Sequence, residues 1–260
     1  MKQSYQHIIL EELDGYWQVW LNRPEKLNAL NNLMIEELTN VFHQIDESKT
    51  RLVVLRGKGK SFCAGADIGW MKNASSMTME ENKRDAKKLA GLLLSLYNLP
   101  VPVLAIAHGA VYGGGIGLLS ACDFVWADKE ASFCFSEGKL GLSPSTIMPY
   151  VLNRVNKSHA KELIFTAKIF NAEEAVSKNI VDKIIEQNQF EMLINSYLLQ
   201  IKNSAPGAVK ESKRLINLLD GKIDNKVFDL TVGSLAERRS TAEAINGVNA
   251  YLNKQKLSWD

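Results

Sequence analysis

The sequence has few of the residues that build metal centres, disulfide frameworks or hydrolytic sites. Its 260 residues include four histidines and three cysteines, and none of them has the Cys-x-x-Cys or His-Glu-x-x-His spacing of a zinc site. The odd number of cysteines, Cys63, Cys122 and Cys134, in apolar surroundings favours reduced thiols over disulfides. No Gly-x-Ser-x-Gly motif is present, so the best signal for serine hydrolysis is missing. We therefore expect neither a metal site nor a disulfide scaffold.

Charge of one sign is not in excess either. The 31 lysines and arginines nearly balance the 29 aspartates and glutamates, which gives no electrostatic basis for a nucleic-acid or membrane partner. The opening residues MKQSYQ are not followed by the apolar segment that a secretory signal requires. Together with the reduced thiols, this predicts a cytoplasmic protein.

One long stretch, residues 89–122, lacks Asp, Glu, Lys and Arg altogether. Its length alone would permit a membrane span. However, Pro100, Pro102 and the glycines of residues 113–117 interrupt it, and a helix cannot continue smoothly through them. The stretch divides better into the end of a helix, a buried strand and a second helix, so we expect no membrane partner.

Hydrophobic periodicity predicts strands and helices over the first three quarters of the chain and helices alone over the last quarter. Apolar runs predict strands at residues 17–21, 52–55, 101–107, 124–127, 132–135 and 180–185. Helix starts are predicted at Thr78, where Glu81 completes a capping box, and at Asn171, Pro206 and Thr241. This pattern indicates an α/β fold with a core over residues 1–190 and a helical region over residues 191–260.

Two glycine-rich segments carry the strongest functional signal. Residues 62–68 (FCAGADI) and 109–117 (GAVYGGGIG) put small residues where the backbone must approach something closely. One such loop alone is more often an ordinary turn, and the second departs from a dinucleotide fingerprint because Ser120 replaces the third glycine. Two loops brought together would offer two amides to one oxygen atom, which stabilises an oxyanion. The two segments therefore predict an enzyme that acts beside a carbonyl group.

With residues 136–142 (SEGKLGL), these segments resemble the crotonase (enoyl-CoA hydratase/isomerase) family, and the resemblance spans nearly the whole chain. It implies a spiral of repeated β-β-α units, with residues 191–260 serving trimer assembly, and hence a homotrimer or a dimer of trimers. It also implies an acyl-CoA thioester substrate. No separate cofactor is implied, since coenzyme A is part of that substrate.

The resemblance assigns roles to individual residues. In the family, amides that match those of Ala66 and Gly114 hold the thioester oxygen, and the residue that matches Glu137 exchanges a proton with the substrate α-carbon. From the residues alone, a carboxylate before Gly138 is as often a solvated turn residue as a functional one. Positions that border coenzyme A in the family correspond here to Lys26, Asn28, Ala64, Asp67, Ile68, Tyr251 and Lys254.

The chain also departs from the family pattern. Well-studied enoyl-CoA hydratases carry a second glutamate where this chain has Gly117. Either Glu137 positions the water and delivers the proton itself, another group substitutes, or water addition is not the reaction. A single carboxylate can move a proton between C2 and C4, so a Δ3,Δ2-enoyl-CoA isomerase is the alternative. A non-catalytic acyl-CoA-binding protein is an alternative of another class.

Residues 62–71, 113–123 and 135–144 look most like the bacterial methylglutaconyl-CoA hydratase branch, whose members need not keep the second glutamate. We therefore expect water addition to a 2-enoyl-CoA, in particular a branched one such as methylglutaconyl-CoA. The acidic acyl group of that substrate would bind best beside a positive charge, for which Lys139 and Arg154 are candidates. Lysine and arginine are, however, more commonly solvated surface residues. His108 lies beside the second loop, but a single histidine there is more often packed than catalytic.

Overall fold

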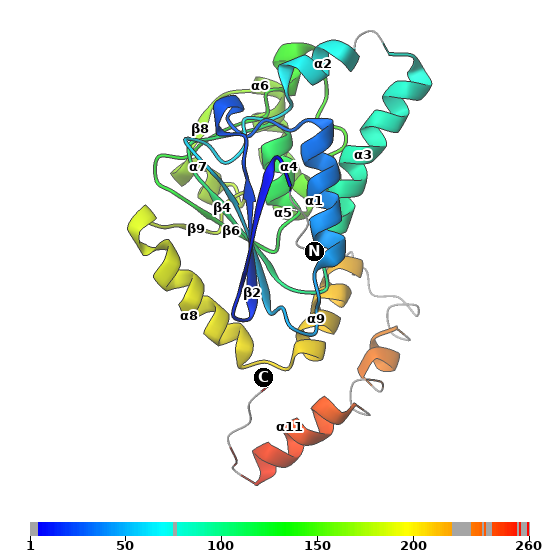
Figure 1. The fold of residues 1–260 in the computed structure, drawn as a ribbon, viewed down its shortest axis with the longest axis vertical. Coiled ribbons are helices and arrows are strands. Elements are labelled where there is room, and N and C mark those ends of the chain that lie inside the picture. The colour runs from blue at the N-terminus through cyan, green and yellow to red at the C-terminus, as the bar shows by residue number, and fades with distance from the viewer. Residues whose placement is uncertain are drawn as a thin grey trace.

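The computed structural model describes residues 5–74, 77–219, 230–235, 237, 241–253, 255 and 259, and within them the chain forms two sheets (Figure 1). The larger sheet has the order β1 (Ile8–Leu13), β2 (Tyr16–Leu21), β3 (Leu52–Gly57), β4 (Val103–Ala107), β6 (Phe124–Ala127) and β9 (Lys183–Ile184). The smaller one has the order β5 (Ala110–Tyr112), β7 (Ser132–Cys134) and β8 (Phe170–Asn171). Only the β1–β2 and β7–β8 pairs are antiparallel among these described strands.

From β4 to β7, successive strands alternate between the two sheets. The chain passes from β4 in the larger sheet to β5 in the smaller sheet. Helix α4 (Gly114–Ser120) then leads back to β6 in the larger sheet, and β7 follows in the smaller one. This repeated passage places the start of α4 at the junction of the sheets. The apolar stretch of residues 89–122 thus divides as predicted, although β5 lies where only a turn was expected. Among the described residues, no helix combines the length and the apolar character needed to cross a bilayer.

Helices cover both faces of the larger sheet (Figure 1). Helices α1 (Asn32–Gln44), α3 (Met79–Tyr97), α4 and α5 (Met148–Arg154) contribute to the main apolar core on one face. On the other face, α8 (Phe190–Lys202) packs Phe190, Ile194 and Leu198 against side chains of β2, β3, β4 and β6. The remaining described helices are α2 (Ile68–Ala74), α6 (Lys157–Thr166), α7 (Ala172–Ser177), α9 (Pro206–Leu218) and α11 (Ala242–Leu252), with 3₁₀ turns η1 (Pro24–Lys26), η2 (Glu137–Leu140) and η3 (Gln187–Gln189).

The predicted helix starts are confirmed by their capping contacts. Thr78 Oγ1 accepts from the Glu81 amide at 3.3 Å, and Glu81 Oε2 accepts from the Thr78 amide at 2.8 Å. The Asn171 side chain accepts from the Glu174 amide, α9 begins at Pro206, and Thr241 Oγ1 accepts from the Ala244 amide at 3.2 Å. Each cap satisfies amides that the first helical turn leaves without an intrahelical acceptor.

The helical region beyond residue 190 is not a single separate layer. Helix α8 belongs to the core, whereas α11 lies at the end of the molecule opposite α2 (Figure 1). The division at residues 190–191 and the role of the second part in trimer assembly stay predictions.

Candidate functional site

A cavity of about 450 Å³ lies where the first glycine loop, the second glycine loop and η2 meet. Helices α2 and α3 form one wall, and the segment between η2 and α5 forms another. Its lining includes Leu30, Ala64, Ala66, Ile68, Trp70, Met71, Asn82, Asp85, Ala86, Leu89, Gly113, Gly114, Ser136, Glu137, Leu140, Leu142, Ser143, Pro144, Thr146 and Ile147. Five of the predicted site residues, Ala64, Ala66, Ile68, Gly114 and Glu137, are therefore together in one cavity.

The first loop is held against the segment before α1 by backbone hydrogen bonds. The Leu30 amide donates to Gly65 O and the Asp67 amide donates to Leu30 O, each at 2.8 Å. In this pairing the Ala66 amide points away from Leu30, and no backbone carbonyl in the described part of the chain accepts from it. Gly65 has a φ of 102°, which a side chain would strain. The loop thus leaves one amide free at the cavity.

The second loop lies directly beside the first. The Tyr112 amide donates to Cys63 O at 3.0 Å, and a Cβ atom on Gly115 would lie only 2.4 Å from that same carbonyl oxygen. Gly114 is the first residue of α4, so its amide has no intrahelical acceptor and lies at the positive end of a short helix. Glycine at residue 115 is therefore required for the two loops to bring both free amides to one cavity.

Glu137 begins η2 and places its carboxylate against the second loop. The Oε1 atom lies 3.1 Å from the position that a Cβ on Gly113 would occupy. The Oε2 atom is buried and has no hydrogen-bond partner among the described residues. This burial raises the pKa of Glu137 above its usual value, despite a hydrogen bond from its own amide that lowers it. The group is thus a buried carboxylate with one unpartnered oxygen, well suited to accept and return a proton.

The position that holds a second glutamate in well-studied hydratases is closed. A Cβ atom on Gly117 would lie 2.3 Å from Ile147 Cγ2 and 2.9 Å from Ile147 Cβ. Ile147 is buried and lines the cavity, with Leu93 behind it. An apolar side chain therefore occupies the space that a longer side chain on α4 would need.

No positively charged side chain is among the described residues that line the cavity, so they provide no counter-charge for an acidic acyl group. Among its described lining residues, only Asp85 and Glu137 are charged. Arg154 instead binds Asp182 through two contacts of 2.6 and 2.7 Å and lines a different cavity. The exposed Lys139 is not part of the lining, and its Nζ lies 3.9 Å from Cys134 Sγ. The suggestion that Arg154 serves the acyl group is wrong, because its guanidinium is already committed to a carboxylate.

Four of the residues expected to border coenzyme A lie around the first loop. Ala64 and Ile68 line the cavity, and the Ala64 amide donates to Leu27 O, which places Lys26 on an adjoining turn. Asp67 accepts from the Trp70 amide at 3.1 Å and from Arg23 at 3.0 Å.

Burial raises the pKa of Asp67, but these two hydrogen bonds outweigh it and hold the pKa below its usual value. Asp67 therefore stays ionised and holds the start of α2 and the Arg23 segment in place.

Asn28 lies inside the fold, between two loops. It is fully buried, its Nδ2 donates to Lys58 O and Ser61 O, and its Oδ1 accepts from the Arg23 amide at 2.7 Å. Both Nδ2 hydrogens and one lone pair of Oδ1 are used to join two loops, so the side chain serves the fold. A contact of Asn28 with coenzyme A stays a prediction.

The two remaining predicted residues lie near the end of the chain. The backbone of Tyr251 is at the end of α11, and Lys254 lies outside the described residues. Helix α11, to which Tyr251 belongs, lies at the opposite end of the molecule from α2, whose residues line the cavity (Figure 1).

His108 is a packed residue, as its surroundings predicted. Its Nε2 lies 3.0 Å from Gly59 O, and the residue is absent from the cavity lining. Burial lowers the pKa of its imidazole. In the described part of the chain, no group of three or more His, Cys, Asp or Glu side chains is placed to hold a metal ion.

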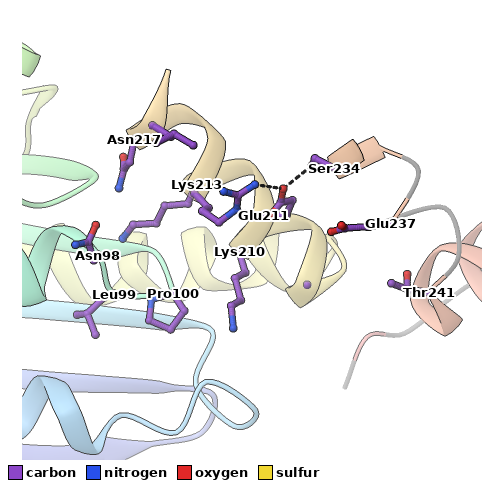
Figure 2. A pocket seen from close by; sticks show the side chains of 13 residues that line it. Asn98, Leu99, Pro100, Lys210, Glu211, Lys213, Asn217, Ser234, Glu237 and Thr241 are labelled. Carbon is purple, nitrogen blue, oxygen red and sulfur yellow. Dashed lines mark hydrogen bonds and ion pairs between the residues drawn. The ribbon is translucent and has the colours of Figure 1, made fainter. Parts of the chain in front are cut away.

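A larger cavity of about 710 Å³ lies beside α9, and Figure 2 shows that side chains of this helix dominate its wall. None of the predicted site residues lines it. Its charged groups are engaged: Lys213 binds Asp123, Lys210 binds Glu47, and Glu211 binds Arg214 and Ser234. Size alone therefore does not mark the site, since those of the charged side chains just named that line this cavity are all paired.

Most of the lining residues were not assigned to the site from the sequence, and two of them bear on its chemistry. Ser136 and Ile147 have no local signal, since a serine before a turn and an isoleucine before a helix are both ordinary. Only the folded arrangement shows that Ser136 faces Gly113 and that Ile147 covers Gly117.

Comparisons with known proteins show the family to which the chain is similar. The family model for enoyl-CoA hydratase/isomerase matches residues 11–260. The chain is 33% identical over 259 residues to the short-chain-enoyl-CoA hydratase of Clostridium acetobutylicum, covering 96% of each protein. It is also 33% identical over 254 residues to the mitochondrial Delta(3,5)-Delta(2,4)-dienoyl-CoA isomerase of Mus musculus, covering 91% of this chain and 76% of that protein.

The crystal structure of an enoyl-CoA hydratase from Shewanella pealeana matches with a TM-score of 0.92 at 31% identity, covering 98% of this chain and 96% of that one. This match confirms the predicted crotonase fold. With two glycine loops and one carboxylate converging on a single cavity, and with a family match over nearly its whole length, the chain belongs to the enoyl-CoA hydratase/isomerase (crotonase) family.

Proposed function

We propose that the protein adds water to the double bond of a 2-enoyl-CoA thioester, with Glu137 as the proton-transferring group and the Ala66 and Gly114 amides as an oxyanion hole. The observation that carries the proposal is the buried, unpartnered Oε2 of Glu137, which shares a cavity with two amides that lack backbone acceptors. Such groups are costly to bury and are expected where a ligand completes them.

The chemistry follows from the charges that each step creates. When the oxygen of water attacks C3, the π electrons of the C2–C3 bond move onto the thioester oxygen. Two amides and the start of α4 stabilise that negative charge. Glu137 takes a proton from the water and returns it to C2 as the enolate collapses, giving a 3-hydroxyacyl-CoA. The raised pKa of Glu137 suits both transfers, since a stronger base is also a usable acid near neutral pH.

Double-bond isomerisation is the second candidate, and Ile147 favours it. Residue 117 is a glycine, so it supplies no second carboxylate to activate water, and Ile147 fills the space beside it. Glu137 alone would then move a proton from C2 to C4 over the same oxyanion hole. The hydratase and the isomerase named above have equal identity to this chain, so identity does not separate the two reactions.

The cavity favours a neutral acyl chain. Its described charged residues are two carboxylates, and a free carboxylate on the substrate would be repelled by both. A methylglutaconyl thioester is therefore less suitable than a neutral 2-enoyl chain, straight or branched.

Binding of the coenzyme A part is proposed around Lys26, Ala64 and Ile68, which lie at or beside the cavity. The position of α11 at the opposite end of the molecule from α2 supports a contribution of Tyr251 to a neighbouring chain in a trimer, rather than to its own.

The test is a set of neutral acyl-CoA esters assayed for three reactions. Crotonyl-CoA reports hydration, 3-hexenoyl-CoA reports double-bond migration, and butyryl-CoA in D2O reports exchange of the α-protons. We expect exchange with butyryl-CoA and hydration of crotonyl-CoA. Migration without hydration would select the isomerase, and tight binding with no exchange would show a non-catalytic acyl-CoA-binding protein.

A further inference from the structure

Two side-chain oxygens flank the open space above Gly113. A Cβ atom at Gly113 would lie 3.1 Å from Glu137 Oε1 and 3.5 Å from Ser136 Oγ. Gly113 has a φ of 46°, and its amide donates to Cys134 O at 2.9 Å, which fixes the loop in this conformation. Since glycine has no side chain, the space between the carboxylate and the hydroxyl stays open to the cavity that all three residues line.

The hydroxyl of Ser136 is not used by the fold. Ser136 stands at the N-cap of η2, where a serine normally accepts a hydrogen bond from an amide of the first turn, yet it makes no such bond. Its backbone carbonyl accepts from the Lys139 amide at 3.1 Å, but its hydroxyl has no hydrogen-bond partner in the described part of the chain. The residue is only partly buried. By contrast, Ser143 in the same cavity lies 2.6 Å from Ser145 through their hydroxyls. Ser136 therefore keeps a free acceptor and a free donor beside Glu137.

We propose that Ser136 and Glu137 together hold the reacting water above Gly113, and that Ser136 is a catalytic residue for hydration. The inference rests on the proposed function and supplies the group that replaces the missing second glutamate. One proton of the water is directed to the Glu137 carboxylate and the other to Ser136 Oγ, which leaves a lone pair of the water oxygen free for C3.

The step balances without any further reactant. The bond from the water oxygen to C3 forms while one O–H bond of the water breaks toward Glu137, and the π pair passes to the thioester oxygen. That proton then moves from Glu137 to C2. Ser136 keeps its own proton throughout, because its oxygen acts only as a hydrogen-bond acceptor.

The position of Ile147 supports the assignment, because it excludes the other place in the cavity where the water could be held. Its methyl group closes the space above Gly117, one helical turn beyond Gly114, so water cannot be held there. The opening above Gly113 lies next to the proton-transferring carboxylate and is lined by oxygens rather than by methyl groups.

The experiment compares Ser136→Ala with Ser143→Ala, a matched loss of one hydroxyl from the same cavity. In Ser136→Ala, hydration of crotonyl-CoA should fall at least about tenfold, the value of one well-placed hydrogen bond. Exchange of butyryl-CoA α-protons in D2O needs Glu137 and the oxyanion hole but no added water, so it should stay within about threefold. In Ser143→Ala, whose hydroxyl pairs with Ser145 in the wild type, the ratio of hydration to exchange should stay within about twofold of the wild-type ratio.

Two results would overturn the role of Ser136 while leaving the proposed function intact. These are unchanged hydration in Ser136→Ala and an equal fall of hydration and exchange in that variant. Absence of hydration in the wild-type protein would instead reject the proposed function. Retained exchange in Ser136→Ala also shows that the variant is folded.

Discussion

The cavity around Glu137 and the cavity beside α9 differ in whether their buried charged groups have partners. Beside α9, Lys213 Nζ lies 2.6 Å from Asp123 Oδ2 and 3.0 Å from Val101 O, so a buried ammonium has both a counter-charge and a carbonyl. Around Glu137, one carboxylate oxygen has no partner and two amides have no backbone acceptor in the described chain. The first arrangement holds elements together, whereas the second leaves groups to be completed by a ligand.

This difference shows which buried polar groups serve folding and which serve chemistry. A buried ion pair contributes little net stability but is strongly destabilising when one partner is removed. A buried carboxylate without a partner destabilises the fold as it stands, and its retention needs a functional reason. Three variants and one change of pH test this contrast.

Lys213→Met should give the largest effect, and on stability alone. It leaves Asp123 without its counter-charge and removes the link from α9 to the turn before β4. We expect a loss of about 3 kcal/mol in the free energy of unfolding, at the lower end because the Asp123 side chain is 22% exposed. Chemical denaturation measures this loss. The hydration rate below the unfolding transition should stay within about threefold, and a much larger fall would show that the two cavities are coupled.

Glu137→Gln should lower the activity without lowering the stability. The amide keeps the size of the side chain but cannot accept a proton, so turnover should fall at least about a hundredfold, which corresponds to about 2.7 kcal/mol in the activation barrier. Its unfolding temperature should match or exceed that of the wild type, because a desolvated carboxylate is removed. Normal turnover in the folded variant would refute the assignment of Glu137.

Gly117→Ala should destabilise the protein by about 2 kcal/mol, since its Cβ would overlap Ile147. Alanine is otherwise the better helix former, so the sign of the change itself separates packing from helix propensity. The double variant with Ile147→Ala should lose less stability than the sum of the two single changes, because Cγ2 is then absent. Additive losses in denaturation curves would mean that the two residues do not interlock.

The pH dependence of stability should give the smallest effect of the four. Burial raises the pKa of Glu137 in the folded state, so the folded protein binds this proton more tightly than the unfolded chain does. The contribution of Glu137 to stability is therefore most favourable below the unfolded pKa and is lost as the pH rises through the folded pKa. The unfolding temperature of Glu137→Gln minus that of the wild type should grow over this range. A constant difference would contradict a raised pKa.

Much of the fold was predictable from local signals. The capping box at Thr78, the caps at Asn171 and Thr241, and the apolar strands of residues 52–55 and 124–127 are all found as expected. Each depends on neighbours within a few residues along the chain. The strands of the smaller sheet were harder, because β5 and β8 have three and two residues, too few for a periodicity to show.

The candidate site was predictable in part. The two glycine loops and Glu137 do meet in one cavity, as the resemblance implied. Asn28 and Arg154 could not be assigned from their residue types, since an amide or a guanidinium serves a ligand or the fold depending on its partners. In the folded chain both are engaged with other protein groups.

The amino-acid order alone determined the succession of strands and helices, the helix caps and the presence of two loops with exposed amides, because these follow from short-range sterics and hydrogen bonding. Tertiary packing alone decided that Gly113 opens between Ser136 and Glu137, and that Ile147 closes the space at Gly117. These residues are more than twenty positions apart, or belong to elements that meet only across the core. Their contacts exist only once the sheets have brought α4, η2 and α5 together.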